Sequence, residues 1–293
     1  MCIFKGSGVA LVTPFTKDGL INFPMMKKLI DFHCENKTDA IIICGTTGES
    51  AALTDDEKTA CFKAAVEYAD GRIPVIAGTG TNATFHAIRL TKAAEEAGVD
   101  GLLIVTPYYN KTTQEGLIAH YTSIAKETTL PIIMYNVPSR TGLNMTAQTA
   151  AHLINSIDNI VGIKEASGNI SQVAKIMALT NGNADLYSGN DDQIVPVLSL
   201  GGKGVISVLA NVAPKETHDM CEAYFDGDWK GSTELQLRSL PLIEQLFSEV
   251  NPIPVKKAMH FIGYEVGDPR LPLIRLSSEN SEKLLKAMTE YGL

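Results

Sequence analysis

"NIVGIKEASGN" (residues 159–169) starts as a short apolar run and ends in a lysine and a glutamate, Lys164 and Glu165. An apolar run without polar alternation is typical of a parallel strand that is covered on both faces. A lysine at the end of such a strand leaves water. Desolvation lowers the pKa of a lysine, and a neutral amine is a nucleophile. The side chain therefore either pairs with a carboxylate or acts as a buried amine, and the rest of the chain decides between the two.

Seven further apolar runs recur along the chain and alternate with amphipathic segments such as 55–69 and 83–98. Alternating strands and helices predict a parallel sheet. Eight such units, ending near residue 225, predict a (β/α)8 TIM barrel. An open doubly wound sheet is the alternative, disfavoured because no GxGxxG follows the first run. The seven runs are 8–14, 39–49, 73–80, 100–110, 130–139, 184–191 and 203–211.

Local signals define several helix ends. Thr54 with Glu57 fits a capping box, and Thr146 precedes another helical pattern. Gly71 and Gly98 stand where helices should stop.

The alternation of predicted strands and helices ends after Asp226. Segments 228–247, 254–264 and 279–291 are helical in pattern, with no strand between them. We therefore predict two parts: a catalytic barrel over 1–226 and a helical extension over 227–293. The extension is expected to pack on the barrel or to build an oligomer contact.

Composition excludes several functions. The chain has 293 residues and a net charge of -8, and no Lys/Arg run stands out, so nucleic acid and anionic membranes are poor partners. Five cysteines without a CxxC suggest reduced thiols and a cytoplasmic location. We expect no signal peptide and no transmembrane helix, because no apolar stretch reaches about 18 residues.

Metal and cofactor signals are also lacking in the sequence. The six histidines show no HxH or HExxH spacing, and no nucleotide or flavin motif occurs. Asp191 and Asp192 are expected to cap the helix after the seventh strand rather than bind a cation. The sequence therefore predicts side-chain chemistry without a metal or a cofactor.

The carboxyl ends of the eight strands should carry the active site, as in other barrels of this class. Hydroxyl groups gather there, and Lys164 is the lysine among them, whereas Glu165 should face the other side of its strand. A desolvated lysine among hydroxyls suits an imine with a carbonyl substrate. A buried ion pair stays the structural alternative.

Three further strand ends carry candidate groups. GTTGES (45–50) offers hydroxyls and closely spaced N–H groups that can hold a small carboxylate or phosphate, although it can also be a plain tight turn. Tyr135 can relay protons or be a rim aromatic. Arg140 can clamp a carboxylate or lie free on the surface. Tyr108 and Tyr109 should face opposite sides of the chain, one toward the site and the other toward an interface.

Taken together, these strand ends resemble the dihydrodipicolinate synthase family over essentially the whole chain. The family comprises class I aldolase-like barrels that condense pyruvate with L-aspartate 4-semialdehyde, giving 4-hydroxy-tetrahydrodipicolinate on the path to lysine and diaminopimelate. The combination of YNVPSRTG (135–142) with GIKEASG (162–168) is highly specific for this family. The motifs are GTTGES (45–50), TPYYNK (106–111), YNVPSRTG (135–142), GIKEASG (162–168), SGND (188–191) and GVISV (204–208).

The resemblance implies catalytic roles for four residues. Lys164 matches the Schiff-base lysine, and Tyr135 matches the tyrosine that passes protons to and from the intermediate. Thr46 and Tyr109 match its relay partners, with Tyr109 reaching the site of a neighbouring subunit. This arrangement implies a homo-oligomer, usually a tetramer built as a dimer of dimers.

The resemblance also implies substrate contacts. Thr47 matches the residue that binds the pyruvate carboxylate, and Ile206 matches a position whose backbone contacts pyruvate. Arg140 matches the residue that receives the semialdehyde, and Gly189 lies beside the bound substrate.

The chain departs from the pattern of lysine-inhibited members. Their two histidine positions hold Asp55 and Lys58, and their glutamate position holds His86. A ligand ammonium would lose its carboxylate partner, so weak or absent lysine feedback is expected and the site would be vestigial. The inhibitor positions that do match are Ala51, Asn82 and Tyr108.

Two alternatives remain. A sister enzyme, N-acetylneuraminate lyase or a 2-keto-3-deoxy sugar acid aldolase, would share the lysine and tyrosine but lack an arginine matching Arg140. A catalytically inactive barrel that binds small acids is the alternative from another class, although every chemical position being filled speaks against it.

Overall fold

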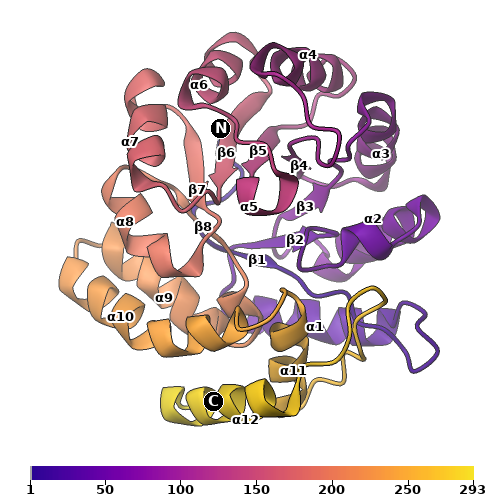
Figure 1. Cartoon of the computed structure of the whole chain (residues 1–293), viewed down its shortest axis with the longest axis vertical. Helices are drawn as coiled ribbons and strands as arrows, with labels where there is room; N and C mark the ends of the chain where they lie inside the picture. Colours follow the sequence, from indigo (N-terminus) through magenta and orange to yellow (C-terminus); the bar gives the residue numbers. More distant parts are fainter. Residues whose placement is uncertain (1) are drawn as a thin grey trace.

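The computed structural model describes residues 2–293, and within that range eight parallel strands close into a barrel (Figure 1). Neighbours in sequence are neighbours in the sheet, and β8 pairs with β1 through Gly6↔Gly204 to Val9↔Ser207. The TIM-barrel prediction is confirmed, and the open-sheet alternative is wrong. The strands are β1 (Gly6–Ala10), β2 (Ala40–Ile43), β3 (Val75–Gly78), β4 (Gly101–Val105), β5 (Ile132–Asn136), β6 (Ile160–Glu165), β7 (Asp185–Ser188) and β8 (Gly204–Ser207).

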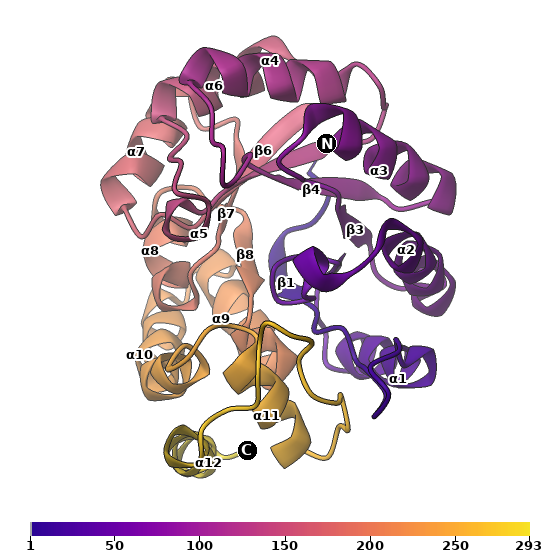
Figure 2. The same cartoon turned by 45° about the vertical axis from the view of Figure 1, so that its right-hand side comes forward.

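Helices surround the barrel, and α10 to α12 lie together on one side of it (Figure 2). The helices between and after the strands are α1 (Phe23–Glu35), α2 (Asp55–Ala69), α3 (Thr84–Ala97), α4 (Gln114–Ala125), α5 (Pro138–Thr141), α6 (Ala147–Ser156), α7 (Ile170–Leu179), α8 (Ile194–Ser199) and α9 (Pro214–Phe225), with short 3-10 turns η1 (Ser50–Ala52), η2 (Asp191–Gln193) and η3 (Leu209–Asn211). The extension consists of α10 (Trp229–Leu246), α11 (Ile253–Phe261) and α12 (Ser278–Tyr291).

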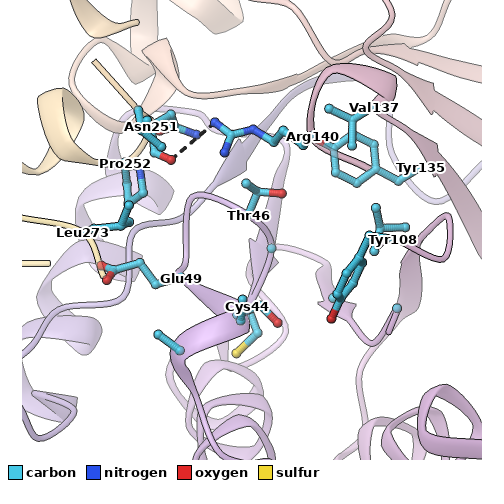
Figure 3. A pocket seen from close by; sticks show the side chains of 18 of the residues that line it. Cys44, Thr46, Glu49, Tyr108, Tyr135, Val137, Arg140, Asn251, Pro252 and Leu273 are labelled. Atoms are coloured by element: carbon cyan, nitrogen blue, oxygen red, sulfur yellow. Dashed lines mark hydrogen bonds between the residues drawn. The ribbon is translucent and has the colours of Figure 1, made fainter. Parts of the chain in front are cut away.

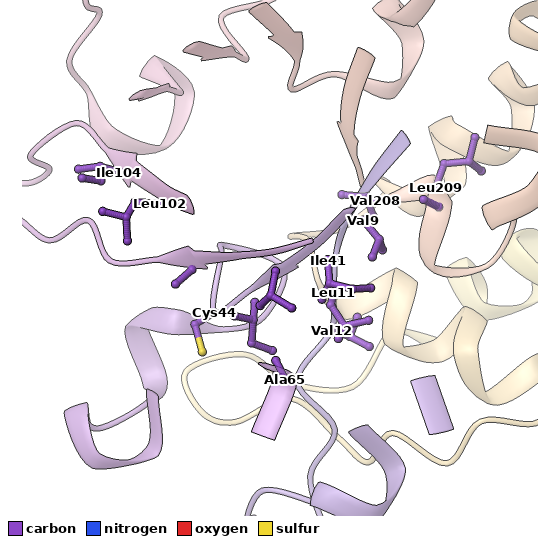
Figure 4. Packing of buried hydrophobic residues seen from close by; sticks show 14 of the residues in the cluster. Val9, Leu11, Val12, Ile41, Cys44, Ala65, Leu102, Ile104, Val208 and Leu209 are labelled. Atoms are coloured by element: carbon purple, nitrogen blue, oxygen red, sulfur yellow. The ribbon is translucent and has the colours of Figure 1, made fainter. Parts of the chain in front are cut away.

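The strands bury both of their faces, and most of them do so in two separate apolar clusters. Successive residues of a strand point to opposite faces, so Ile41 of β2 lies in the cluster between sheet and helices, while Ile42 lies inside the barrel. Figure 4 shows part of the outer cluster, with Ile41 close to Leu11 and Val12. The inner cluster also contains Tyr135 and Ile206. This double burial explains why the strands have apolar runs without alternation.

An irregularity in β6 determines which way Lys164 points. The pairing of β5 with β6 shifts between Ile132 and Ile133, and Gly162 takes the place opposite Ile133. A Cβ atom on Gly162 would lie 1.9 Å from the carbonyl oxygen of Asp185, so only glycine fits there. After the shift, Lys164 lies opposite Tyr135.

Most of the predicted helix ends are found. The Thr54–Glu57 capping box begins α2, and the Thr146 side chain caps α6. Gly98 ends α3 in the left-handed conformation, with φ at 85°. Helix α2 ends one residue earlier than expected, at Asp70, because this residue adopts the left-handed conformation itself.

The extension packs on the last units of the barrel. Gln236 of α10 donates through Nε2 to the carbonyl oxygen of Asp191 (2.9 Å) and accepts from the N–H of Val195 (3.1 Å). The division of the chain at residue 226 stays a prediction. Over the described part of the chain, no helix has both the length and the apolar character needed to cross a bilayer.

Candidate active site

Lys164 is buried at the carboxyl end of β6, with 6% of its surface exposed. Its Nζ lies 4.3 Å from the ring centroid of Tyr135 on β5. Across residues 2–293 the amine makes no ion pair and no hydrogen bond, so the buried ion pair that the sequence left open is not formed. Gly189 leaves room beside it, since a Cβ there would lie 3.1 Å from Lys164 Cε.

Glu165 points away from Lys164, as predicted. Its carboxylate accepts hydrogen bonds from Asn136 Nδ2 (3.0 Å), Gln172 Nε2 (2.9 Å) and the N–H of Ser167 (2.8 Å). Because Gln172 belongs to α7, this network lies on the outer face of the strand. The carboxylate is satisfied by neutral donors and stabilises the end of β6 without neutralising Lys164.

Asp191 is the second buried acid in this region, and its predicted role was wrong. Its Oδ2 accepts from the N–H groups of Val208 (3.0 Å) and Leu209 (2.9 Å). The carboxylate therefore caps the turn after β8, not the helix after β7. Burial raises the pKa of Asp191 above its usual value. The donors that decide its position come from a turn distant in sequence.

A cavity of about 390 Å³ opens at the carboxyl ends of the strands (Figure 3). Among the predicted site residues, Thr46, Tyr108, Tyr135, Arg140 and Ala51 line it. Residues 250–252 and 270–273 of the extension form the opposite wall. Outside this lining lie Lys164, Thr47, Ile206, Gly189, Tyr109 and Asn82, and Lys164 Nζ is 4.3 Å from the ring centroid of the lining residue Tyr135. Among residues 2–293, no three or more side chains of His, Cys, Asp or Glu are grouped so that they could hold a metal ion.

The loop that follows β2 is held in place by contacts between Glu49 and two residues of the C-terminal extension, Lys256 and Arg270. Glu49 has a left-handed backbone with φ at 56° and forms an ion pair with Lys256 of α11, with 2.5 Å between Oε1 and Nζ. The N–H of Arg270 donates to the other oxygen of Glu49 (2.8 Å). Burial lowers the pKa of Lys256, and Glu49 opposes that shift. Sequence patterns missed this pair because its members are far apart in the chain.

Thr47 and Arg140 are joined by one residue of the extension. Thr47 is buried, and its Oγ1 accepts from Asn251 Nδ2 (3.0 Å). Arg140 lies in the short helix α5, and its Nη2 donates to the backbone carbonyl oxygen of Asn251 (3.3 Å; Figure 3). Sequence reasoning did not identify Asn251, whose local sequence, an Asn-Pro step, indicates only a turn.

The two adjacent tyrosines separate as expected from their positions. Tyr108 lines the cavity, and burial raises the pKa of its phenol. Tyr109 has a positive φ of 71° and is 84% exposed. A single chain therefore does not bring Tyr109 to Lys164 and Tyr135, and its role in a neighbouring subunit stays a prediction.

A second part of the same cavity is lined by Ala51, Tyr108 and Lys58. Lys58 is buried, and burial lowers its pKa. The nearby Asp55 carboxylate forms a hydrogen bond with His86 Nε2 (2.8 Å) and an ion pair with Arg89. Burial acts to raise the pKa of Asp55, but these hydrogen bonds outweigh it and hold that pKa below its usual range.

Comparison with known proteins shows the family and the fold of the chain. Residues 3–291 match the model of the Dihydrodipicolinate synthetase family. A 4-hydroxy-tetrahydrodipicolinate synthase of Lachnoclostridium phytofermentans is 55% identical over 293 residues, which is 100% of both chains. A DHDPS from Cyanidioschyzon merolae, solved with lysine bound, superposes with a TM-score of 0.97 at 42% identity, covering 100% of each chain.

A further solved relative holds a ligand. The dihydrodipicolinate synthase of Acinetobacter baumannii, solved with pyruvate, has a TM-score of 0.96 at 44% identity and covers 98% of this chain and 99% of its own. Sequence similarity and barrel geometry thus agree over the full length. The chain belongs to the dihydrodipicolinate synthetase family.

Proposed function

We propose that this chain condenses pyruvate with L-aspartate 4-semialdehyde through a Schiff base on Lys164 and releases 4-hydroxy-tetrahydrodipicolinate. The observation that carries the proposal is the Lys164 amine, which is buried beside Tyr135 and has no anionic partner in the described chain. The relative from Lachnoclostridium phytofermentans bears the name of this activity, which makes the enzyme a lyase of lysine and diaminopimelate biosynthesis.

The chemistry follows from the position of the amine. Lys164 attacks the keto carbon of pyruvate, and water leaves as the imine forms. The iminium nitrogen withdraws electrons and makes the pyruvate methyl group acidic. Tyr135 then takes a proton from that methyl group, and the resulting enamine attacks the aldehyde carbon of the second substrate. The amine of the semialdehyde finally displaces Lys164 as the ring closes.

Each of the other groups has a role in this sequence. Thr46 and Tyr109 would relay protons to Tyr135, with Tyr109 supplied by a neighbouring subunit. Thr47 and the backbone of Ile206 would hold the pyruvate carboxylate. Gly189 keeps the space beside Lys164 open.

Arg140 distinguishes this proposal from a sister aldolase. Its guanidinium lines the cavity and donates to a backbone carbonyl oxygen rather than to a carboxylate. It therefore keeps donors for the carboxylate of the semialdehyde. An aldolase for sialic acid would not need this group.

The exposure of Tyr109 favours assembly. Tyr109 is 84% exposed and holds a left-handed φ of 71°, a strained conformation that a contact with a neighbouring subunit would stabilise. The assembly we propose is a homotetramer built as a dimer of dimers, in which Tyr109 of one subunit reaches the active site of its neighbour. The location we propose for it is the cytoplasm.

Borohydride trapping tests the proposal directly. Incubation of the chain with pyruvate and borohydride should add one reduced pyruvate to each chain, detected by intact mass and located by peptide mapping. Lys164→Ala should lose the adduct. The matched control is Lys256→Met, which removes another buried lysine and should keep it.

The same experiment separates the alternatives. An adduct with cleavage of sialic acid but no condensation would establish the sister aldolase. No adduct at all would establish the inactive barrel, and an adduct on a different lysine would overturn the assignment of Lys164.

A further inference from the structure

Asn251 lies between α10 and α11 and contacts both proposed substrate-binding groups. It is 5% exposed although it lines the cavity. Its side chain reaches Thr47 on the loop after β2. Its backbone carbonyl oxygen reaches Arg140 after β5, as Figure 3 shows. One residue of the extension thus connects two strand ends of the barrel.

The hydrogen bond to Thr47 has a definite direction. Asn251 Nδ2 donates to Thr47 Oγ1 at 3.0 Å. A hydroxyl has one proton and can accept on its oxygen at the same time. Because the amide supplies the proton of this bond, the proton of Thr47 stays free, and within the described chain the hydroxyl makes no other hydrogen bond. An ionised carboxylate only accepts, so it needs such a free proton.

The amide of Asn251 contributes little else. Its Oδ1 is buried and has no hydrogen-bond partner in the structure of residues 2–293. A buried acceptor without a partner reduces stability, so hydrogen bonding within the fold does not by itself explain an amide at this place. The bond to Thr47 is the side-chain contact that remains, and Thr47 is the residue proposed to hold the pyruvate carboxylate.

We propose that Asn251 is a positioning residue, whose amide orients the Thr47 hydroxyl so that its proton is directed at the pyruvate carboxylate. Its backbone carbonyl oxygen separately orients the Arg140 guanidinium at the mouth of the cavity. The proposal rests on the proposed function, because it assigns pyruvate to Thr47. It gives the helical extension a part in substrate binding.

Asn251→Asp tests the direction of the bond while keeping the shape of the side chain. At neutral pH the new carboxylate cannot donate, so Thr47 turns its proton toward it and away from pyruvate. The KM for pyruvate should rise roughly tenfold to a hundredfold, the range expected for a lost hydrogen bond to a charged group. The kcat and the KM for the semialdehyde should change little, because the backbone carbonyl oxygen still holds Arg140.

The pH profile separates a loss that depends on the new charge from a loss of fold, and the double-mutant cycle with the uncharged Asn251→Leu separates positioning from repulsion of pyruvate. Protonation of the new carboxyl restores a donor, so the ratio of variant to wild-type KM should shrink as pH falls. A ratio that stays constant with pH overturns the proposal, and so does an unchanged KM for pyruvate in a folded variant.

A double-mutant cycle provides the second measurement, which also serves if Asn251→Asp folds poorly. Thr47→Val removes the hydroxyl, and on that background Asn251→Leu should raise the KM for pyruvate no further. Equal effects of Asn251→Leu with and without Thr47→Val overturn the proposal. Wild-type trapping of pyruvate reports on the proposed function alone, so its failure is distinguishable from failure of the role of Asn251.

Discussion

Two buried lysines at the mouth of the barrel have opposite surroundings. Lys164 lies on β6 with its Nζ 4.3 Å from the ring of Tyr135, and Lys256 lies on α11 with its Nζ 4.1 Å from the ring of Phe15. Both are almost fully buried. Lys256 forms an ion pair with Glu49 at 2.5 Å, whereas Lys164 has no such partner in residues 2–293.

The difference separates a structural lysine from a chemical one. An ion pair offsets the desolvation of both charges, so Lys256 acts as a joint between α11 and the loop after β2. The face of an aromatic ring offers a much weaker attraction for an ammonium group. An amine without an anion has no ion pair to break before it attacks a carbonyl group. Burial alone therefore does not identify the reactive lysine; Lys164 differs from Lys256 in lying beside Tyr135 and in forming no ion pair within residues 2–293.

The largest effect is expected for Lys164→Met. Condensation should fall by roughly 10⁴-fold, because the covalent route is lost. The free energy of unfolding should stay equal or increase, since an unpaired buried amine is replaced by an apolar chain of similar length. Steady-state kinetics and urea unfolding measure the two quantities. A large loss of stability would place Lys164 with Lys256 as a structural residue.

Lys256→Met should show the reverse pattern. Glu49 then becomes an unpaired buried carboxylate, and the free energy of unfolding should decrease by about 3–5 kcal/mol. The pyruvate adduct on Lys164 should persist in the folded fraction. The matched control is Lys256→Met with Glu49→Gln, which removes both charges and should recover most of the lost stability. If the double variant is as unstable as the single one, the charge is not the cause.

His33 sharpens the comparison, because it is a buried base that avoids an unpaired charge by staying neutral. Its Nδ1 bonds to Thr38 Oγ1 at 2.9 Å, and burial lowers the pKa of His33 to about 3. In the unfolded chain this pKa lies near 6.5. Between these two pH values His33 is therefore protonated in the unfolded state but neutral in the folded state. Stability is therefore lost as pH falls from about 6.5 toward about 3.

Urea unfolding at about pH 7.5 and about pH 5 measures this effect. The contribution of His33 should be about 2 kcal/mol at the lower pH. His33→Gln should flatten the pH dependence by that amount. His152→Gln, at an exposed histidine, should leave it unchanged. Equal pH dependence in wild type and His33→Gln would contradict the assignment.

The smallest effect is expected from L-lysine. Lys58 is buried in the cavity beside Ala51 and Tyr108, and the Asp55 carboxylate is occupied by His86 and Arg89. An ammonium ligand would meet a positive charge and no free carboxylate there. We expect the condensation rate to be unchanged by L-lysine at about 1 mM in a coupled assay. Inhibition below that concentration would show that the assembled protein rebuilds the site.

The strand ends could be predicted because their signals are local. The apolar runs indicate buried strands, and parallel strands bring their carboxyl ends to one edge whatever the details of packing. Lys164, Tyr135 and Thr46 were therefore expected at one mouth. The opposite directions of Lys164 and Glu165 followed from the two-residue period of a strand.

Asp191 shows where local reasoning fails. An aspartate before a helix favours a cap, yet the donors that bind this carboxylate come from the turn after β8. Their proximity depends on closure of the barrel. The role proposed for Tyr109 likewise depends on a neighbouring subunit, which no local pattern describes.

The sequence by itself determined the barrel, its helix caps and the set of side chains at its mouth, since these depend on periodicity and on residues a few positions apart. Only the tertiary structure decided that Glu49 pairs with Lys256 and that Asn251 donates to Thr47. Those contacts join residues about two hundred positions apart, and no local pattern encodes them. The carboxylates of Glu165 and Asp191 are likewise satisfied by donors that packing brings together, and Lys164 forms no ion pair within residues 2–293.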